Sequence, residues 1–419
     1  MFCLTFSAFY FTINLNMEEK YSLLKAKLNT AFSKNAGYSV TFECGETEKA
    51  VLNVLSTRFT GGKVAVLYFK THYRRGSEFT ESLKSRGNKP VSVLMPEGEK
   101  NSVENFSRLF NLSEDVRAVV TFEKDLFVAC RYFAALRGIT CVLAYNEPYI
   151  AGTLAQTVPI INGNEIERVS LTPDTVAVVD PDKIAASCRA ELFAEVMSSV
   201  LLLAESGVSR ALGGKKVNAK AVAVLSDAVK LAHSVYKAPY DKQCALLIES
   251  AFTAEYAEIL SDGRLYGESS LFSADFLAGG RLTGITRMEF AKRLLAMYAE
   301  TVSSAKIRFP LLPDYTLRAS ALSEKTGIDD GYFLRAVSAQ SGVFRKTLKR
   351  GEARSVLKTT AAFTGLIEKA ESTYRALGGK DEPSEETLKL ALKYSGDVFG
   401  ETLAPAYLRE SGYTELIPV

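Results

Sequence analysis

Five short runs of apolar, mostly β-branched residues, separated by segments long enough to form helices, constrain the fold of this 419-residue chain most strongly. None of them alternates apolar with polar residues, so each predicts a strand that is buried on both faces. Strands of this kind spaced by helices predict an α/β fold with a Rossmann-like parallel sheet. The runs are Val64–Phe69, Val91–Leu94, Ala118–Phe122, Thr140–Ala144 and Thr175–Val179.

The strand pattern ends near residue 184, and the rest of the chain is rich in Ala, Leu, Glu and Lys, with glycines at the expected helix ends. Composition changes most clearly at Asp180-Pro181-Asp182. Because a chain of this length favours two domains, we predict an α/β nucleotide-binding-like domain over residues 17–183 and an all-helical domain over residues 184–419. The expected helices are Ser187–Ser206, Val217–Lys237, Asp241–Ser261, Thr286–Ala305, Arg354–Leu377 and Glu385–Ser411.

The ends, the cysteines and the charges of the chain indicate its surroundings. Residues 1–16 carry no charge and lack the features of a secretory signal, so we expect either a misassigned start or a disordered tail. Six scattered cysteines without a C-x-x-C pair are typical of a reducing compartment, which favours the cytoplasm. A net charge of +3 argues against nucleic-acid binding, and the lack of a long uncharged apolar run argues against a membrane span.

Several kinds of enzyme chemistry lack their residues in this sequence. It contains no G-x-x-x-x-G-K-[ST], G-x-G-x-x-G or H-E-x-x-H motif, so P-loop and zincin mechanisms have no basis here. His72 and His233 are its only histidines, which excludes a metal site built on several histidines.

An ordered set of short matches runs through both halves of the chain: Pro96–Glu104, Arg137–Ile139, Val178–Ile184, Tyr266–Ser269 and the stretch Pro383–Thr414. Together they resemble the superfamily of dehydroquinate synthase, iron-dependent alcohol dehydrogenases and glycerol-1-phosphate dehydrogenase, and the last of these branches most closely. The resemblance implies a dehydroquinate synthase-like fold. It also implies an NAD(P)- and metal-dependent oxidoreductase acting on a phosphorylated or polyol substrate, of the type that converts dihydroxyacetone phosphate to glycerol 1-phosphate.

In that superfamily a glycine-rich turn after the fourth strand holds the dinucleotide pyrophosphate, because glycines let backbone N–H groups approach the phosphates. The equivalent positions here are Phe122, Glu123, Lys124 and Asp125. Two carboxylates there disfavour a diphosphate, although acidic residues at a helix start also simply complement the helix dipole. Asn146 falls on the next cofactor-binding turn, where an ordinary turn residue is the alternative interpretation.

The superfamily holds a divalent metal with one carboxylate and two histidines of the helical domain, and the ion polarises the substrate oxygen. Alignment without gaps places these ligands on Ser198, Ala245 and Tyr266, none of which is a good ligand. A second register places the carboxylate on Glu195 instead. Because one carboxylate cannot hold the ion, the resemblance implies that the metal site has been lost.

Four residues remain as candidates for catalysis in the expected cleft between the domains. His72 follows the strand that ends at Phe69, and an imidazole there could act as an acid or base near neutral pH; an exposed loop histidine is the alternative. Lys242 and Tyr266 could donate a hydrogen bond to a developing alkoxide, and Glu268 could line the same polar pocket. Solvated residues at helix ends are the simpler interpretation of these three.

The sequence therefore predicts a dehydrogenase-like fold with degenerate cofactor and metal motifs. We expect a protein that binds a small molecule or a partner protein in or near the interdomain cleft, without catalysis and without a firm cofactor. An active NAD(P)-dependent oxidoreductase with an altered site is one alternative. A subunit of a hetero-oligomer that stabilises an active relative is another, and the chain itself could form a homo- or hetero-oligomer. The sequence leaves open whether the chain is an enzyme.

Overall fold

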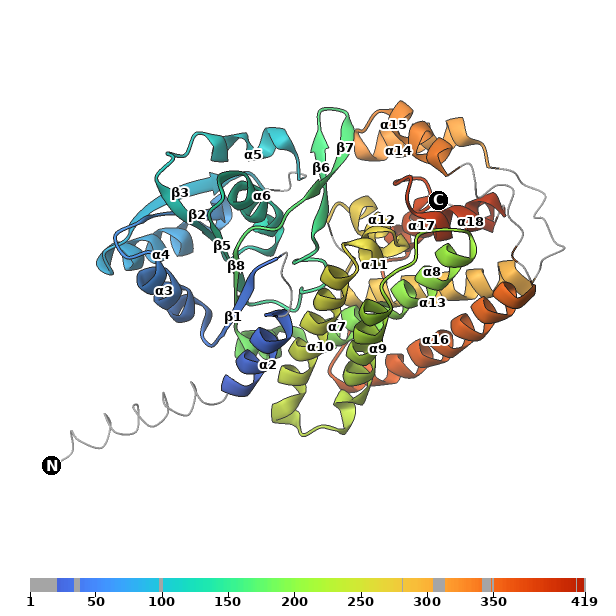
Figure 1. Cartoon of the computed structure of the whole chain (residues 1–419), viewed down its shortest axis with the longest axis horizontal. Coiled ribbons are helices and arrows are strands. Elements are labelled where there is room, and N and C mark those ends of the chain that lie inside the picture. Colours follow the sequence, from blue (N-terminus) through green and yellow to red (C-terminus); the bar gives the residue numbers. More distant parts are fainter. Residues whose placement is uncertain are drawn as a thin grey trace.

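A computed structural model describes residues 21–33, 38–97, 101–280, 282–303, 313–340, 348, 350–411 and 413–417. Residues 1–16, for which a misassigned start or a tail is predicted, lie outside the described residues, as do residues 98–100 of the segment Pro96–Glu104. The described chain forms a half that contains a parallel sheet and a half that is helical (Figure 1). This architecture agrees with the predicted fold class.

In the described residues the main sheet has six parallel strands in the order β1-β8-β5-β4-β2-β3. Along β2, Val64 and Val66 face one side while Ala65 and Leu67 face the other, and all four side chains are buried. Burial on both faces explains why the strands form unbroken apolar runs in the sequence. All five predicted strands are present, and an edge strand is added to them. The strands are β1 (Val40–Cys44), β2 (Lys63–Phe69), β3 (Lys89–Met95), β4 (Val116–Thr121), β5 (Thr140–Tyr145) and β8 (Thr175–Val179).

Helices cover both faces of the sheet (Figure 1). On one face α3 (Thr47–Arg58) and α4 (Tyr73–Ser85) enclose a separate apolar core, and on the other α5 (Val103–Phe110) and α6 (Phe127–Arg137) pack against a core that continues into the helical half. Short 3-10 turns follow β2 and β4 at the carboxyl edge of the sheet. They are η1 (Lys70–His72) and η2 (Lys124–Leu126).

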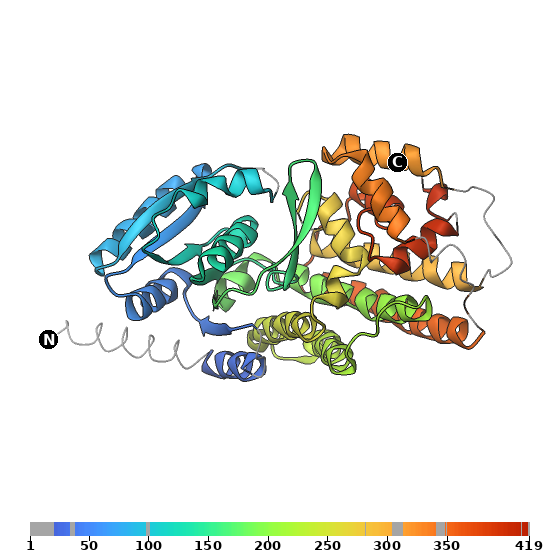
Figure 2. The same cartoon turned by 45° about the horizontal axis from the view of Figure 1, so that its top comes forward.

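An antiparallel hairpin stands between the sheet and the helical half (Figure 2). It consists of β6 (Thr157–Asn162) and β7 (Glu165–Ser170), and the sequence analysis missed it. Its two-residue turn is Gly163-Asn164, with Gly163 at a φ of 57°, and Gly-Asn between two strands is a signal for a hairpin turn. The charged residues of β7 weaken the apolar pattern that predicts a strand, whereas the turn residues indicate a hairpin.

Arg131, on α6, fixes the chain on either side of this hairpin. The side chain is fully buried, and its guanidinium donates to the main-chain carbonyls of Thr153 at 2.8 Å, Ala155 at 2.6 Å and Leu171 at 2.7 Å. Buried carbonyls need such partners, because an unpaired polar group in the interior is costly. The buried cation therefore ties the segment before β6 and the segment after β7 to the sheet half.

The helical half begins where the composition changes. Asp180 caps the first helix by accepting a hydrogen bond from the Lys183 backbone N–H at 3.0 Å, and Pro181 takes the first helical position, where its missing N–H costs nothing. The helices are α7 (Pro181–Ser198), α8 (Val200–Ala211), α9 (Ala219–Ser234), α10 (Tyr240–Leu260), α11 (Arg264–Gly267), α12 (Ser270–Leu277), α13 (Gly284–Ser303), α14 (Tyr315–Thr326), α15 (Asp330–Ala339), α16 (Arg350–Ala376), α17 (Glu385–Tyr394) and α18 (Leu403–Glu410), with the 3-10 turns η3 (Val235–Lys237) and η5 (Tyr413–Leu416).

Three predicted helices differ from the structure. The helix expected to begin at Ser187 begins at Pro181 and is interrupted at Ser199, and the one expected over Glu385–Ser411 is divided into α17 and α18. The helix expected to begin at Thr286 begins at Gly284, so Thr286 lies inside α13, where its hydroxyl accepts a hydrogen bond from the Ser384 backbone N–H at 3.1 Å.

Helix α2 (Ser22–Phe32) precedes the sheet in sequence but connects the two halves. Lys27 Nζ lies 2.7 Å from Oε2 of Glu249 on α10. The ring of Phe32 also lies 5.2 Å from that of Tyr256 on the same helix, centroid to centroid. Both views show α2 beside α10 (Figures 1 and 2).

One helical stretch of the described residues, Arg189–Ala211, is long and apolar enough to cross a membrane by length and composition alone. It combines the end of α7 with α8, and most of it is buried inside the protein. Among its residues Leu201 and Val208 are fully buried. Such burial is expected of a core helix in a large helical domain.

Candidate functional site

The predicted cofactor turn lies between β4 and α6, at the carboxyl edge of the sheet where ligands of α/β folds commonly bind. Phe122 is buried there, and its ring meets that of Phe79 edge-on with 4.7 Å between the centroids. The Arg75 guanidinium carbon lies 5.0 Å from the Phe122 centroid. A large ring therefore anchors the turn to the core at a position where a close phosphate contact needs a glycine.

His72, the last residue of η1, interacts with the second residue of this turn. Its Nδ1 lies 2.9 Å from Oε1 of Glu123, whose side chain is only 12% exposed. Burial raises the pKa of Glu123, while His72 and Arg75 lower it in part. The candidate base is thus oriented by a carboxylate, and the half-exposed imidazole lies on the edge of the sheet that the sequence predicted.

The rest of the turn is also occupied by interactions between side chains. Lys124 Nζ lies 3.4 Å from the centroid of the Tyr149 ring and 3.4 Å from Oε2 of Glu147. Asp125 is exposed, and Asn146 is half-buried directly after β5 on the same edge. Lys124 is therefore held on this edge of the sheet by a ring and a carboxylate.

The loop after β5 is held by two buried glutamates of the helical half. Glu195, on α7, accepts hydrogen bonds from the backbone N–H groups of Ile150, at 2.9 Å, and of Ala151. Glu255, on α10, accepts from the N–H groups of Gly152 and of Leu154, the latter at 2.9 Å. The carboxylate that the second register assigned to a metal is therefore engaged in joining the two halves.

Ser198 and Tyr266, two of the positions that the resemblance assigns to metal ligands, come together around a buried ion pair. Nη1 of Arg287, on α13, lies 2.6 Å from Oδ2 of Asp275, on α12, and the two side chains are 2% and 5% exposed. Arg287 Nε donates to Ser198 Oγ at 3.1 Å, and the Tyr266 hydroxyl donates to Asp275. The guanidinium carbon also lies 5.4 Å from the Tyr266 ring centroid.

The electrostatics of this cluster favour a permanently charged Arg287. Burial acts against the charged guanidinium, but Asp275, Tyr266 and Glu195 together raise its pKa. On the carboxylate, the Leu282 backbone N–H donates to Asp275 Oδ1 at 2.9 Å. Both oxygens of Asp275 are therefore occupied by donors, as a buried carboxylate requires.

The other sequence candidates lie elsewhere. Lys242 is exposed in the first turn of α10, and Ala245 lies one turn further on. Tyr266 lies near the other end of this helix, where its backbone N–H donates a hydrogen bond to Glu258 at 2.7 Å. At 1.5 Å per residue, Lys242 and Glu258 are separated by about 24 Å along the axis. Glu268 is half-buried after α11, and burial raises its pKa, although Arg264 and Arg168 lower it. Lys242 therefore lies apart from Tyr266, while a pocket shared by these side chains stays a prediction.

The residues present do not fit the metal that the resemblance implies. In the described part of the chain no group of three or more His, Cys, Asp or Glu side chains could hold a metal ion. At Ser198 and Tyr266 the nearest carboxylate, Asp275, already serves Arg287, whose positive charge repels a divalent cation. We therefore assign no step to a metal.

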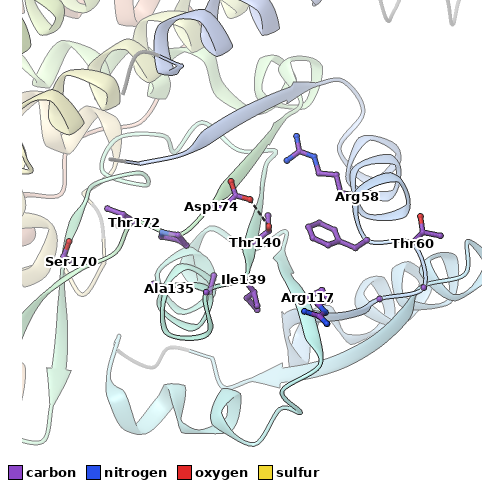
Figure 3. Close-up of a pocket in the computed structure, with 15 residues that line it drawn as sticks. Arg58, Thr60, Arg117, Ala135, Ile139, Thr140, Ser170, Thr172 and Asp174 are labelled. Carbon is purple, nitrogen blue, oxygen red and sulfur yellow. Dashed lines mark hydrogen bonds between the residues drawn. The ribbon is translucent and has the colours of Figure 1, made fainter. Parts of the chain in front are cut away.

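A cavity of about 930 Å³ lies at the opposite, amino edge of the sheet (Figure 3). Arg58 and Arg117 line it together with Asp174, whose carboxylate accepts a hydrogen bond from Thr140 Oγ1 at 2.8 Å. The carboxyl ends of α3 and α6 also reach this cavity, and they carry partial negative charge. The two arginines therefore balance negative charge already present, and the cavity is separate from the Arg287 cluster.

Sequence reasoning missed Arg287, Asp275 and Glu255. Each lies in a helix without a recognisable motif, and its partners belong to other elements. A buried arginine within an apolar helical pattern was the one available signal, since arginine is rarely buried without a paired group.

No protein-family model matches the sequence, and no curated protein matches it. Solved structures are similar in fold. The alcohol dehydrogenase of an archaeal halo-thermophile from a Red Sea brine pool is 11% identical, and the match covers 89% of this chain and 97% of that one with a TM-score of 0.50. The iron-containing alcohol dehydrogenase of Thermococcus thioreducens (14% identity, 89% and 97% coverage, TM-score 0.47) and glycerol dehydrogenase of Schizosaccharomyces pombe (11%, 90% and 89%, 0.46) are further examples.

The match over nearly the whole length of both chains shows that this protein has the same fold as that archaeal alcohol dehydrogenase. The predicted dehydroquinate synthase-like fold is confirmed at that level. The assignment to the glycerol-1-phosphate dehydrogenase branch stays a prediction.

Proposed function

We propose that this protein is a catalytically degenerate member of the iron-containing alcohol dehydrogenase superfamily that binds a small ligand or a partner protein in or near its interdomain cleft. The buried Arg287–Asp275 pair between Ser198 and Tyr266 carries the proposal. It puts a guanidinium where the resemblance implies a Lewis acid, and a guanidinium cannot exchange a ligand for substrate oxygen.

The turn after β4 supports the same proposal. Phe122 is packed into the core, and Glu123 and Asp125 add two carboxylates where a dinucleotide would carry its diphosphate. The negative charges of these carboxylates would repel the diphosphate and so oppose dinucleotide binding. As part of the proposal, the protein acts in the cytoplasm, takes no nucleic acid or membrane as partner, and can assemble with itself or with an active relative.

The test is a titration of the untagged protein with NADH and NADPH, followed by nicotinamide fluorescence, with and without zinc or iron. The chain has no tryptophan, so the protein contributes little background. We expect no saturable binding and no oxidation of NAD(P)H with dihydroxyacetone phosphate, while a glycerol dehydrogenase measured in parallel gives both. Metal-dependent turnover by this protein would refute the proposal.

One observation favours a second candidate, an NAD(P)-dependent oxidoreductase with an altered site. The basic side chains of His72, Arg75 and Lys124 gather around the turn after β4, on the edge where a dinucleotide would bind. If NADH does bind, Lys124→Ala should weaken binding several-fold, because a charge-assisted contact to a phosphate is lost. The exposed Lys84→Ala, on α4, is the matched control and should leave the affinity unchanged.

A further inference from the structure

The centre of the helical half contains its own cation. The Arg287 guanidinium is contacted from three other helices: by the Asp275 carboxylate of α12, the Ser198 hydroxyl of α7 and the Tyr266 ring of α11. None of these contacts is made within α13, on which the arginine lies. Groups from separate elements thus converge on one buried positive charge, as ligands converge on an ion.

We propose that Arg287 is a built-in cation that takes the place of a divalent metal, so that α7, α11 and α12 are held around a guanidinium and the helical half needs no metal ion. This inference does not rest on the absence of catalysis. Saturable NADH binding without added metal in the experiment above would leave it standing, because that binding concerns the turn after β4 and not Arg287.

Charge and geometry explain why a guanidinium suits this place. Asp275 is nearly fully buried, and a buried carboxylate without a cation is strongly destabilising. The planar guanidinium donates in fixed directions and so can reach Asp275 and Ser198 at once, whereas a metal would need lone-pair donors that Ser198 and Tyr266 supply poorly. The Tyr266 hydroxyl also donates a hydrogen bond to the Asp275 carboxylate.

Two consequences follow. In the wild-type protein the Arg287 guanidinium fills the space beside Asp275 and neutralises its charge, so a divalent cation is excluded. Removal of the Arg287 side chain leaves Asp275 buried without a cation. Asp275 alone does not supply the several ligands that a divalent ion needs, so added metal should not restore the lost stability.

The experiment compares the wild type, Arg287→Ala and the control Arg293→Ala, which removes an arginine from the same helix but a more exposed one. Thermal unfolding is measured in EDTA and with Zn²⁺ or Mn²⁺, and bound metal is counted after dialysis. We expect the wild type and Arg293→Ala to retain no metal. For each of these two proteins, the unfolding temperature should be the same in EDTA as with Zn²⁺ or Mn²⁺. Arg287→Ala should unfold at a lower temperature than both in every buffer and should retain no metal, because Asp275 alone cannot hold an ion.

The double variant Arg287→Ala with Asp275→Asn separates the cation from simple packing. It should unfold at a higher temperature than Arg287→Ala in EDTA, because no unpaired carboxylate remains, and it should retain no metal. If Arg287→Ala folds in no buffer, a folded double variant still supports the proposal and an unfolded one overturns it. A wild type that retains a metal equivalent would overturn the proposal, and so would a double variant no more stable than Arg287→Ala.

Discussion

Glu205, on α8, makes the stability of this protein depend on pH in a direction opposite to that of most carboxyl groups. It is 2% exposed and accepts hydrogen bonds from the Ser270 backbone N–H at 2.9 Å and from the Tyr298 hydroxyl at 2.7 Å. Burial raises its pKa from 4.5 to about 7, and the hydrogen bonds only partly oppose the rise. Between these two pH values the folded chain keeps the proton, while the unfolded chain has lost it.

The free energy of unfolding therefore decreases as pH rises from about 4.5 to about 7, since the folded state binds more protons in that window. The contribution of Glu205 to the free energy of unfolding is fully present below pH 4.5 and is lost above pH 7. A pKa change of this size corresponds to about 3 kcal/mol. Glu258, on α10, adds a decrease of the same order, because burial also raises its pKa to about 7.

The assay is urea unfolding followed by circular dichroism between pH 4.5 and pH 8, on the wild type and Glu205→Gln. Glutamine keeps the size of the side chain and carries no charge at any pH in this range. Relative to the wild type, Glu205→Gln should gain about 3 kcal/mol between the two ends of the range. The exposed Glu368→Gln, on α16, should show no such gain. A constant difference between Glu205→Gln and the wild type at all pH values would refute the argument from burial.

Two further predictions concern packing and buried donors. Arg131→Met should lower the free energy of unfolding by about 3 kcal/mol, because three buried carbonyls each lose a partner worth about 1 kcal/mol, and hydrogen exchange should show that the hairpin loosens first. Gly76→Ala should lower it by about 1–3 kcal/mol, because the new methyl group would lie 2.5 Å from the Tyr68 ring. Gly365→Ala, in open space on α16, should instead raise it by up to about 1 kcal/mol, and equal signs in urea unfolding would contradict the packing argument.

Much of the fold could be predicted because the signals for it are local. A strand buried on both faces must be apolar at every position, so the runs around Val66, Val120 and Val178 reveal the parallel sheet without any tertiary information. The hairpin was missed because β7 carries charged residues that reach solvent, so its strand pattern is weak. The interruption at Ser199 was missed because no glycine or proline lies between Asp182 and Ser206 to mark it.

The candidate site was only partly predictable. Its location at the carboxyl edge of the sheet and the positions of His72 and Glu123 came from the order of the elements, yet the 2.9 Å contact between the two side chains did not. Lys242 was grouped with Tyr266 because both were expected at helix ends near the cleft. The length of α10 separates them, and only the three-dimensional course of that helix could show it.

By itself, the sequence determined the α/β and helical halves and, through its two histidines, the lack of a metal site built on several imidazoles. Only the tertiary structure decided that Arg287 and Asp275 form a buried ion pair. Arg287 reaches Asp275 twelve positions away and Ser198 89 positions away, and no periodicity in the chain encodes such a meeting. The physical reason is that secondary structure follows from the local spacing of apolar residues, whereas a buried ion pair follows from which helices pack against one another.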